Sequence, residues 1–574
     1  MDYFKQPISE YIWDIKYRYR QQDKIIDHTI EDTWQRVAKA ASHAESKQER
    51  AAWQKQFYSI LENFQFLPGG RILAGAGTQH DVTLFNCFVM PILEDSLHGI
   101  FDALKEAALT LQQGGGVGYD FSVLRPKGWM VTHTGAVASG PVSFMRIWNV
   151  MCSTMQSTGA RRGAMMGVLR CDHPDIEAFI AAKRDPHELR HFNVSVLVSD
   201  AFMQAIEKNS EWALVFPDKH VVRTVNARDL WEKIMRSAYD YAEPGVLFED
   251  TINRKNNLWY RERISATNPC GEIPLPNYGA CNLGAMNLTQ FIINPFTDKS
   301  SIAWDKLKKS TEIATRFLDN IIDISRYPLK MQKQEAYATR RIGLGITGLA
   351  DALLMLGVRY GSQESLKIAS HIMRCISEAT WHTSIELAKE RDVFPLFQKE
   401  KYLEGEFVKQ LPSDIQQDIA KHGVRHSHHN TIAPTGTISL LANNVSHGIE
   451  PIFSASYQRT VRSLQDELQH FTVKDFAVHQ FKNDQALPEA WVDSQTLTPD
   501  DHLQIQAAVQ PYIDNAISKT INIPEHYPYE KLHDVYAKAF VLGLKGCTIY
   551  RPNAITGSVL TLADHVDRCD QCHE

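Results

Sequence analysis

The stretch Asn268-Pro269-Cys270-Gly271-Glu272-Ile273-Pro274 holds the densest chemistry in the chain. Because proline lacks a backbone donor and glycine favours turns, the residues around Cys270 predict a tight loop instead of a helix or a regular strand. A thiol, an amide and a carboxylate then share one loop. Glu272 could act as a base, Asn268 could orient a hydroxyl group, and Cys270 could be a nucleophile or a radical carrier.

A second cysteine motif, Gly279-Ala280-Cys281-Asn282-Leu283-Gly284, follows shortly after the loop. Cysteine is among the most often buried residues, so both cysteines could be small core side chains. The neighbouring Glu272 and Asn268 favour a chemical role for this region instead. Of the remaining cysteines, we interpret Cys152, Cys171 and Cys375 as core or incidental, and the role of Cys547 stays open.

Outside these motifs, residues 29–64 show helical spacing of apolar side chains, for example at Trp34 and Val37. Beyond Leu67-Pro68-Gly69-Gly70, short alternating strands such as 194–198 are interleaved with amphipathic helices such as 313–321. Strands interleaved with helices indicate one large α/β body. We therefore predict three parts: a helical segment at 1–66, an α/β body at 67–560, and a mobile polar tail at 561–574.

Composition excludes several classes of protein. The 574 residues include 61 Lys+Arg and 67 Asp+Glu, a net charge of −6, which argues against holding nucleic acid by bulk charge. Nine cysteines are an odd number and too few for a disulfide scaffold, which favours the reducing cytoplasm. We see neither a secretory signal nor an apolar run of the ~20 residues that span a bilayer, so no membrane association is expected.

Two other patterns receive structural interpretations. Gly343-Leu-Gly345-Ile-Thr-Gly348 matches a dinucleotide-binding pattern, but without a convincing preceding strand we interpret it as helix packing. His422, His426, His428 and His429 cluster without a nearby cysteine, so we expect a solvated loop and no metal site.

The segment Ala433-Pro434-Thr435-Gly436-Thr437-Ile438-Ser439 combines hydroxyl groups with an unobstructed backbone. Before a helix start, backbone N–H groups in such a segment can converge on a phosphate. An ordinary turn with Ser or Thr caps explains the same residues, so both interpretations stay open.

Taken together, these segments resemble ribonucleotide reductase catalytic subunits, whose finger-loop motif is similar to 268–274. The resemblance spans roughly residues 65–555. It implies a ten-stranded α/β barrel of two parallel five-stranded half-sheets, with a central finger loop that carries Cys270, preceded by a small helical segment. The other similar segments occur in family order: Phe85-Asn86-Cys87 with Asp95-Ser96-Leu97, Gly114 to Asp120, Ser139 to Phe144, Gly159 to Met165, Ala433 to Ser439, and Gly448 to Pro451.

The family generates its radical in three ways, and the sequence favours one of them. The chain has no C-terminal Arg-x-x-Gly-Tyr segment of the glycyl-radical type and no Tyr-Tyr pair of the partner-subunit type. The spacing of 281 − 270 = 11 between the two cysteines, and the segment Lys545 to Pro552, resemble the class II enzymes, which depend on adenosylcobalamin. The alternatives are a class I type subunit that needs a separate radical-generating subunit, and a non-catalytic nucleotide-binding regulator with a zinc-held tail.

The resemblance implies a role for each residue of the loop. Cys270 would carry a thiyl radical that takes the ribose 3′ hydrogen, Glu272 would accept the 3′-OH proton, and Asn268 would position the ribose. Cys87 and Cys281 would supply two electrons and form a disulfide, which requires Cα atoms within ~7 Å.

The tail cysteines Cys569 and Cys572 would then reduce that disulfide and pass the oxidation to a thioredoxin or glutaredoxin. The competing interpretation is part of a zinc site, with His573 and His565 as the nearby ligands.

Binding roles are implied in the same way. Pro434, Thr435, Gly436, Thr437 and Ile438 would cradle the substrate phosphates, and Asn86 and Gly116 would line the ribose site. Asp95, Arg161 and Arg162 would contact a deoxynucleoside triphosphate effector at a homodimer interface. The first 60 residues do not resemble the ATP-binding cone of larger members. Pro68 to Ile72 replaces a common Ser-Pro-Thr segment, so its phosphate contacts are not carried over. The expected activity is the reduction of ribonucleotides, preferably diphosphates, to deoxyribonucleotides for DNA synthesis.

Overall fold

The structure of the protein is a computed structural model of the 574-residue chain. It describes residues 3–22, 24–131, 135–155, 163–185, 187–216, 220–462, 468–481, 487–532, 534–552 and 560–562. None of the described helices is long and apolar enough to cross a membrane.

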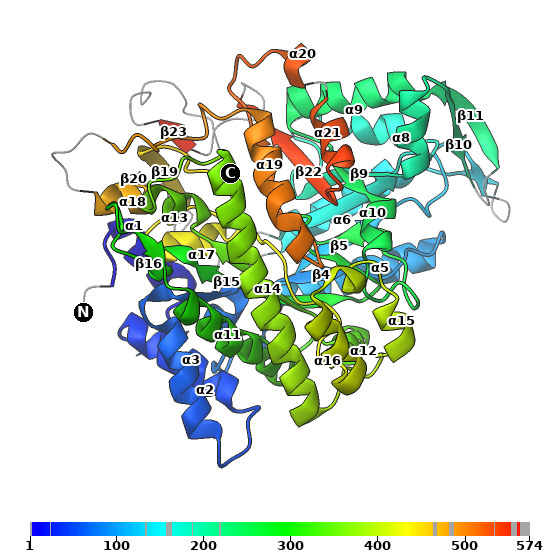
Figure 1. The fold of residues 1–574 in the computed structure, drawn as a ribbon. Coiled ribbons are helices and arrows are strands. Elements are labelled where there is room, and N and C mark those ends of the chain that lie inside the picture. Colours follow the sequence, from blue (N-terminus) through cyan, green and yellow to red (C-terminus); the bar gives the residue numbers. More distant parts are fainter. Residues whose placement is uncertain are drawn as a thin grey trace.

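The chain begins with a layer of helices at one side of the molecule, coloured blue in Figure 1. Helix α2 (Ile30–Ser42) starts at a capping box between Thr29 and Asp32, and it packs against α3 (Arg50–Leu61) through fully buried side chains such as Val37. Both helices confirm the spacing in the sequence. Helix α1 (Pro7–Lys16), which starts at a proline, also lies within the segment 1–66 that was predicted to be helical.

Five parallel strands form the first half of a barrel. Their order is β4, β5, β8, β9, β12, and each pairs in parallel with the next. The predicted strand at 194–198 lies within β9. The bounds are β4 (Cys87–Val89), β5 (Gly116–Asp120), β8 (Met165–Arg170), β9 (Phe192–Val198) and β12 (Gly245–Phe248), with the intervening helices α5 (Leu97–Gln112), α6 (Pro141–Thr154), α7 (Ile176–Ile180), α8 (Asp200–Glu207) and α9 (Ala227–Tyr241).

The second half is also parallel. Strand β15 (Ala280–Asn287) pairs with β18 (Ile342–Thr347), and β21 (Thr520–Asn522) pairs with β22 (Gly546–Tyr550). The segment 430–432 links these two pairs through parallel bridges, Leu344 to Asn430 and Ile432 to Ile517. The helices of this half include α11 (Trp304–Ile324), α12 (Lys330–Thr339), α13 (Leu349–Met355), α14 (Gln363–Arg391), α16 (Ser413–His422), α17 (Gly436–Leu441), α19 (Pro499–Val509) and α21 (Val535–Val541).

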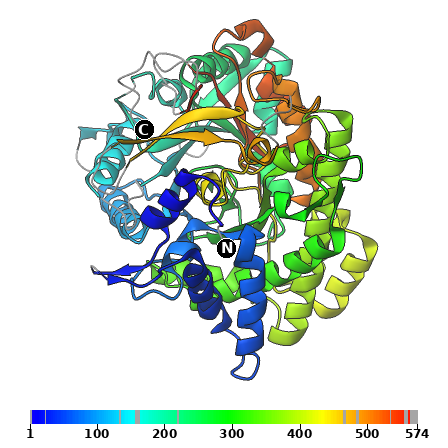
Figure 2. The same cartoon turned by 90° about the vertical axis from the view of Figure 1, so that its left-hand side faces the viewer.

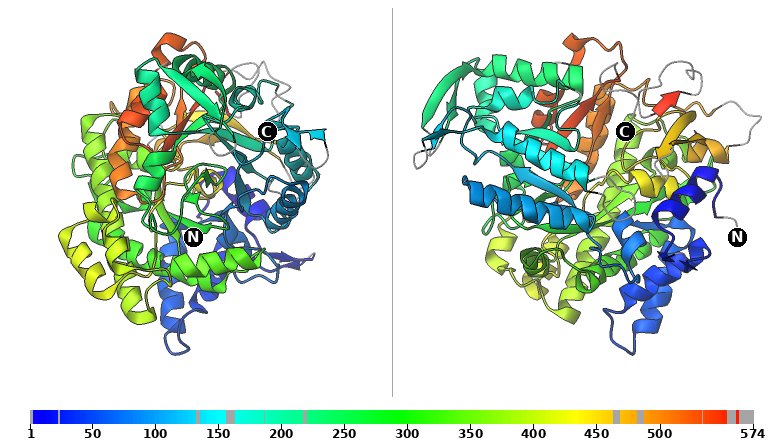
Figure 3. Two further views of the ribbon diagram at one scale, coloured as in Figure 1. Left: turned by 90° about the vertical axis from the view of Figure 1, so that its right-hand side faces the viewer. Right: turned by 180° about the vertical axis from the view of Figure 1, so that it is seen from behind.

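Two antiparallel junctions join the halves. Strand β15 pairs with β4, where Cys281 faces Cys87, and β22 pairs with β12, where Cys547 faces Val246. With 430–432 as a strand, the sheet closes on itself as ten strands, so the expected barrel of two five-stranded half-sheets is confirmed. Figures 2 and 3 show the helices arranged around the outside of these strands.

Smaller elements decorate the barrel. Strand β3 (Phe66–Pro68) pairs antiparallel with β15. The others are β1 (Arg20–Gln21), β2 (Lys24–Ile25), α4 (Gly70–Gly75), β6 (Met130–Val131), β7 (Ala136–Val137), β10 (Glu211–Val215), β11 (Val221–Asn226), α10 (Glu249–Arg254), β13 (Ala266–Thr267), β14 (Pro274–Leu275), β16 (Ile292–Ile293), β17 (Ser301–Ile302), α15 (Lys399–Leu403), β19 (Ser456–Arg462), β20 (Leu468–Lys474), α18 (Phe476–Gln480), α20 (Tyr529–Leu532) and β23 (Leu560–Leu562).

The structure corrects two interpretations of the sequence. The glycine pattern 343–348 lies mostly in strand β18, not in a helix contact, and a Cβ at Gly345 would come within 2.0 Å of the Thr431 carbonyl oxygen. His426, His428 and His429 are fully buried and do not form a solvated loop. His426 Nε2 contacts Asp319 and His429 Nδ1 contacts Asp514, so these rings have buried carboxylates as partners, while His429 Nε2 is buried without a hydrogen-bond partner among the described residues.

Candidate active site

The loop around Cys270 is the tip of a short hairpin. Strands β13 and β14 pair antiparallel, and the tip is closed by two hydrogen bonds onto Asn268. The Ile273 amide donates to Asn268 Oδ1 at 2.9 Å, and the Gly271 amide donates to the Asn268 carbonyl at 3.1 Å. Gly271 has a φ of +81°, which L side chains rarely adopt. The predicted tight loop therefore depends on Asn268 and Gly271.

The hairpin lies against the inner face of β5, and two glycines of that strand make room for it. A Cβ at Gly118 would come within 1.8 Å of the Thr267 carbonyl oxygen, and one at Gly116 would come within 3.1 Å of Pro269 Cγ. Any larger residue at 118 would displace the hairpin. An inner apolar cluster surrounds it: Cys87, Val89, Met166, Val168, Leu197, Leu247, Ile252, Ile264, Ala266, Ile273, Leu275, Cys281 and Leu283.

Both halves of the barrel hold the loop. From the first half, Asn193 Nδ2 donates to the Pro269 carbonyl at 2.8 Å. From the second half, Thr431 Oγ1 and the Ala516 amide donate to the Glu272 carbonyl at 2.8 and 2.9 Å. Since both half-sheets donate hydrogen bonds to the tip, the loop is held between them.

Cys270 is the exposed member of the seven cysteines that the structure describes. Next to it, a Cβ added at Gly271 would meet nothing within 4 Å. The thiol at the tip is therefore accessible from outside the loop, whereas Cys87 and Cys281 of the barrel wall are buried.

Behind the tip, three side chains converge. Asn268 Nδ2 donates to Cys87 Sγ at 3.1 Å, and the Cys87 thiol donates to Glu272 Oε1 at 3.8 Å. Asn268, Glu272 and Cys87 are all almost fully buried. A thiol, a carboxylate and an amide thus form one contact group directly behind Cys270.

Cys281 completes the group from the neighbouring strand. It lies directly opposite Cys87 in the register of β15 and β4, where Cα atoms of paired residues are about 4.5–5.5 Å apart. That separation is within the range of a disulfide. Burial raises the pKa of the Cys281 thiol, so this sulfur keeps its proton at neutral pH.

Gly116 and Asn86 border the same place. Gly116 is the β5 partner of Cys87, so Cys87 sits between Cys281 on one side and Gly116 on the other. Asn86 Oδ1 is buried without a hydrogen-bond partner, which leaves an acceptor for a ligand hydroxyl beside Cys87.

The segment 434–438 lies at the start of α17. Thr435 has a left-handed φ of +56° and occupies the N-cap position without a capping hydrogen bond to its side chain. Its Oγ1 lies 2.9 Å from Thr347 Oγ1 and accepts from the Gly448 amide at 2.9 Å, so the turn is fixed by β18 and by the chain beyond α17. Thr437 is exposed and Gly436 has open space around it, which keeps the helix start accessible.

The predicted effector residues are only partly described. Asp95 forms an ion pair with Arg125, whose Nε donates to Asp95 Oδ2 at 2.8 Å. Arg161 and Arg162 lie outside the described residues, and so do the tail cysteines Cys569 and Cys572.

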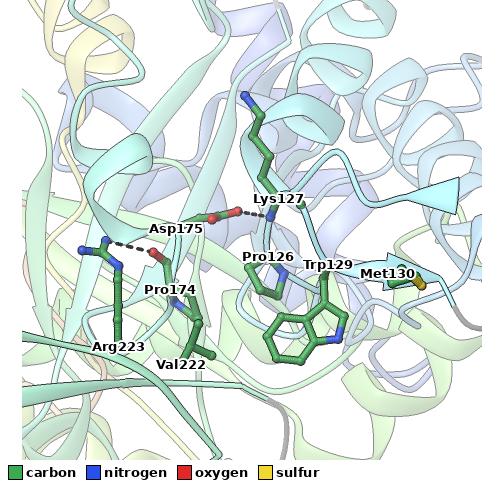
Figure 4. Close-up of a pocket in the computed structure, with 9 residues that line it drawn as sticks. Pro126, Lys127, Trp129, Met130, Pro174, Asp175, Val222 and Arg223 are labelled. Atoms are coloured by element: carbon green, nitrogen blue, oxygen red, sulfur yellow. Dashed lines mark hydrogen bonds between the residues drawn. The ribbon is translucent and has the colours of Figure 1, made fainter.

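The residues that directly follow Arg125 in the chain help to line a groove of about 590 Å³ (Figure 4). Trp129, Lys127 and Arg223 are among the residues that line it, and Asp175 accepts from the Lys127 backbone amide at 2.8 Å. The groove combines cationic side chains with an aromatic face.

Three supporting residues escaped the sequence analysis: Asn193, Thr431 and Thr347. Each acts through a contact with a residue distant in sequence, so no local spacing points to it. Of the three, only Thr431 could have been suspected from the sequence, because it directly precedes the Ile432-Ala433-Pro434 segment. In the part of the chain that the structure describes, no three His, Cys, Asp or Glu residues are grouped to hold a metal ion.

Comparison with known proteins finds matches both to the barrel and to the helices that precede it. Residues 85–550 match the family model "Ribonucleotide reductase, barrel domain", and residues 3–81 match "Ribonucleotide reductase, all-alpha domain". The chain is 39% identical over 553 residues to the vitamin B12-dependent ribonucleoside-diphosphate reductase of Mycobacterium tuberculosis (strain CDC 1551 / Oshkosh), which covers 92% of this chain and 76% of the relative.

Other relatives include a further vitamin B12-dependent reductase and a reductase that is named as a subunit alpha. The vitamin B12-dependent ribonucleoside-diphosphate reductase of Thermoplasma acidophilum is 36% identical over 580 residues, covering 97% of this chain and 72% of the relative. The ribonucleoside-diphosphate reductase subunit alpha of Chlamydia trachomatis is 27% identical over 478 residues, covering 73% of this chain and 45% of the relative.

Proposed function

Because the chain belongs to the ribonucleotide reductase family, we propose that it reduces ribonucleoside diphosphates to 2′-deoxyribonucleotides for DNA synthesis. In this proposal the chain uses adenosylcobalamin as its cofactor. It is an oxidoreductase of the class II type, since the relatives at 36–39% identity carry vitamin B12-dependent names. The observation that carries the proposal is the contact group of Cys87, Asn268 and Glu272 directly behind the exposed Cys270.

The surroundings of Cys270 fit a bulky cofactor. The thiol is exposed and open space adjoins Gly271, so a corrinoid can approach the tip without displacing the barrel wall. When bound next to Cys270, adenosylcobalamin would supply the radical chemistry that takes the hydrogen atom from the Cys270 thiol and leaves a thiyl radical there. Residues 268–273 hold that sulfur in place through the contacts from both half-sheets.

Substrate activation follows from the residues behind the tip. The Cys270 thiyl takes the 3′ hydrogen of the ribose, because S–H and C3′–H bonds have comparable strength, and returns it at the end. Glu272 accepts the 3′-OH proton, so the 2′-OH can leave as water with a proton from the Cys87–Cys281 pair. Asn268 donates to Cys87 in the structure, and it is placed to orient the ribose as well.

The two electrons come from Cys87 and Cys281. Each thiol loses its hydrogen, one S–S bond forms, and one ribonucleotide becomes one deoxyribonucleotide and one water. Their direct pairing in register supports this assignment. In our proposal, Cys569 and Cys572 of the tail then reduce the disulfide by thiol exchange and are themselves reduced by a thioredoxin or glutaredoxin, which agrees with a cytoplasmic location.

Substrate phosphates bind at residues 434–438 in this proposal. The support is the accessible start of α17 at the carboxyl end of 430–432, with its turn held by Thr347 and Gly448. Backbone N–H groups of Thr437 and Ile438 face the anion there.

Effector control and dimerisation form the regulatory part of the proposal. We place a deoxynucleoside triphosphate near Asp95, Arg161 and Arg162, and the adjoining groove at Lys127 and Trp129 offers a cation and an aromatic ring for it (Figure 4). Helices α5 and α6 carry exposed apolar side chains, among them Phe101 and Val150, which suit contact with a second copy of the chain.

The test is turnover of the purified chain with a dithiol reductant, with and without adenosylcobalamin, on diphosphate and triphosphate substrates separately. We expect deoxynucleotide only with the cofactor, and faster product formation from diphosphates. Product that appears only after an iron-containing partner subunit is added contradicts the cofactor assignment. A preference for triphosphates contradicts the substrate assignment alone.

A further inference from the structure

Two buried carboxylates lie close together near residues 434–438, which we proposed to bind the substrate phosphates and which are called the phosphate segment below. Asp351 on α13 and Asp475, which caps α18, both accept a hydrogen bond from the Ala477 amide, each through Oδ1 at 3.0 Å. The two oxygens therefore lie less than twice that distance apart. Both side chains are almost completely buried, at 0% and 3% exposure.

The pair has no cation to neutralise it among the described groups that act on it. Burial and the Asp351 charge raise the pKa of Asp475, and burial raises that of Asp351. The titratable or charged groups nearby are His447, Tyr457, Lys474 and Arg459, and Arg459 acts on His447 and Tyr457. Burial lowers the pKa of His447 to about 4, Tyr457 donates to Asn444, and the Lys474 side chain is exposed. Two adjacent buried carboxylates without a cation cannot both ionise cheaply.

The oxygens of the pair have different partners. Asp475 Oδ1 accepts from both the Ala477 and Val478 amides, which leaves Oδ2 as the oxygen for a proton. Asp351 uses Oδ1 for Ala477 and Oδ2 for the Ser446 amide at 2.5 Å. Asp351 therefore acts as an acceptor on both oxygens, and Asp475 is the natural carrier of a shared proton.

Asp351 connects this pair to the phosphate segment. Residues 443–448 form a strap that leads from α17 back toward Thr435. Asp351 holds the strap at Ser446, whose carbonyl accepts from the Gly348 amide at 2.7 Å and from Thr347 Oγ1 at 2.9 Å. At the end of the strap, Gly448 donates to Thr435 Oγ1 at 2.9 Å.

We propose that Asp351 and Asp475 share one proton carried by Asp475, and that this proton keeps the 443–448 strap in the position that shapes the phosphate segment at Thr435. Both acids are positioning residues, since neither lies at the reacting atoms. The kinetic part of the inference rests on the proposed function, and the structural part does not.

The direction of the pH effect follows from the proton. A group whose pKa is raised in the folded state stabilises that state at low pH, and this contribution is lost as the pH rises through the folded pKa. Loss of the shared proton places two like charges in a buried site, so the strap loosens at high pH. Substrate binding weakens with it, while the chemistry at Cys270 is unaffected.

The first measurement is hydrogen exchange of the peptide 443–448 by mass spectrometry as a function of pH, after correction for the intrinsic pH dependence of exchange. We expect protection of this peptide to fall at high pH in the wild-type chain. In Asp475→Asn, the amide donates permanently in place of the shared proton, so protection stays high throughout. Asp475→Ala loses protection at every pH, and Asp414→Asn, an exposed acid on α16, behaves as wild type.

The second measurement is KM and kcat for the ribonucleoside diphosphate over the same pH range. KM should rise with pH in the wild type but stay constant in Asp475→Asn, with kcat unchanged, whereas Asp475→Ala should raise KM about tenfold. Wild-type protection that does not vary with pH overturns the proposal without any variant. So does an Asp475→Asn chain that keeps the wild-type pH dependence. If no preparation turns over, the proposed function fails and the exchange data still decide this inference.

Discussion

Cys87 and Cys281 face each other across the antiparallel junction of β4 and β15, one of the two seams that close the barrel. The residues are 281 − 87 = 194 positions apart, so the junction alone brings them together. Because both strands are anchored in a continuous sheet, their Cα separation is set by strand pairing and not by a flexible loop. A disulfide can form and open here with little movement of the backbone.

Without an external reductant, the wild-type chain should therefore make at most one deoxynucleotide per fully reduced Cys87–Cys281 pair, apart from any contributed by the tail. A chain with Cys569→Ser and Cys572→Ser isolates the barrel pair. After one turnover, peptide mapping should find the Cys87–Cys281 disulfide. Cys375→Ser is the matched control and should leave the yield unchanged. Repeated turnover by Cys281→Ser with thioredoxin would contradict the assignment of this pair.

Exposure separates Cys270 from the other described thiols. Burial raises the pKa of Cys171 and Cys547 to about 12 and that of Cys152 to about 11, so these sulfurs stay protonated and covered. In the same tail-serine background, we expect an alkylating reagent to label Cys270 first, and bound substrate to slow that labelling. Preferential labelling of Cys171 in the native chain would show that the tip is covered. Cys270→Ser should abolish product completely.

At Glu272 the chemical role of the side chain can be tested separately from the structural role of the backbone. Its carbonyl holds Thr431 and Ala516, whereas its carboxylate contacts the Cys87 thiol. Glu272→Gln keeps the carbonyl contacts and the shape, so we expect kcat to fall about 10²–10⁴-fold with an unchanged melting temperature. Thr431→Val, which removes one contact to the loop, is the structural counterpart and should lower stability more than Glu272→Gln does. A Gln variant with wild-type kcat would remove Glu272 from the mechanism.

Dimerisation can be tested on the exposed apolar surface of α5 and α6. Phe101 is 50% and Val150 is 62% exposed in the single chain. If this surface contacts a second copy, the double variant Phe101→Glu, Val150→Glu should be monomeric by light scattering, because charges cannot be buried in the contact without a large desolvation cost. Effector-dependent substrate choice should disappear with the dimer. The corresponding change at Val541 on α21, which is 83% exposed, is the control. A wild-type chain that is monomeric with effector present excludes the dimer.

The sequence was sufficient for the tip of the loop because its determinants are local. Pro269 and Gly271 dictate the turn, and the side chains of Asn268 and Glu272 follow within it. The barrel came from the family resemblance, since no local pattern specifies closure. The partners of Cys87 and the role of Thr431 depend on strand pairing between distant segments, which spacing along the chain does not contain.

The errors have the same cause. Glycines at 343 and 345 suit helix contacts by pattern, but here they allow Thr431 to approach a barrel strand closely. Polar histidines suggest solvent, yet His426 and His429 are buried because Asp319 and Asp514 lie beside them, 107 and 85 residues away in sequence. Whether a polar side chain is buried depends on a hydrogen-bond partner, and that partner cannot be found from the sequence when it lies far away along the chain.

Asp319 gives the last prediction, on stability in acid. This carboxylate is fully buried between Arg340, Arg391, Arg425 and His426, where it joins α11 to the segment before the barrel strand at 430–432. Burial alone would raise its pKa, but Arg340, His426 and Arg425 together hold the pKa well below its ordinary value. A lowered folded pKa means that the stabilisation is present above the unfolded value, about 3.9, and is lost as the pH falls below it. Asp319→Asn removes one buried carboxylate from this cluster: Arg340 keeps Asp323 and Arg391 keeps Glu45, but Arg425 loses its ion-pair partner. The variant should therefore lose about 3–5 kcal/mol of unfolding free energy at neutral pH and show a shallower further loss in acid. Denaturant unfolding at neutral and acid pH measures both, with the exposed Asp81→Asn as control, and equal acid dependence of Asp319→Asn and wild type would contradict the assignment.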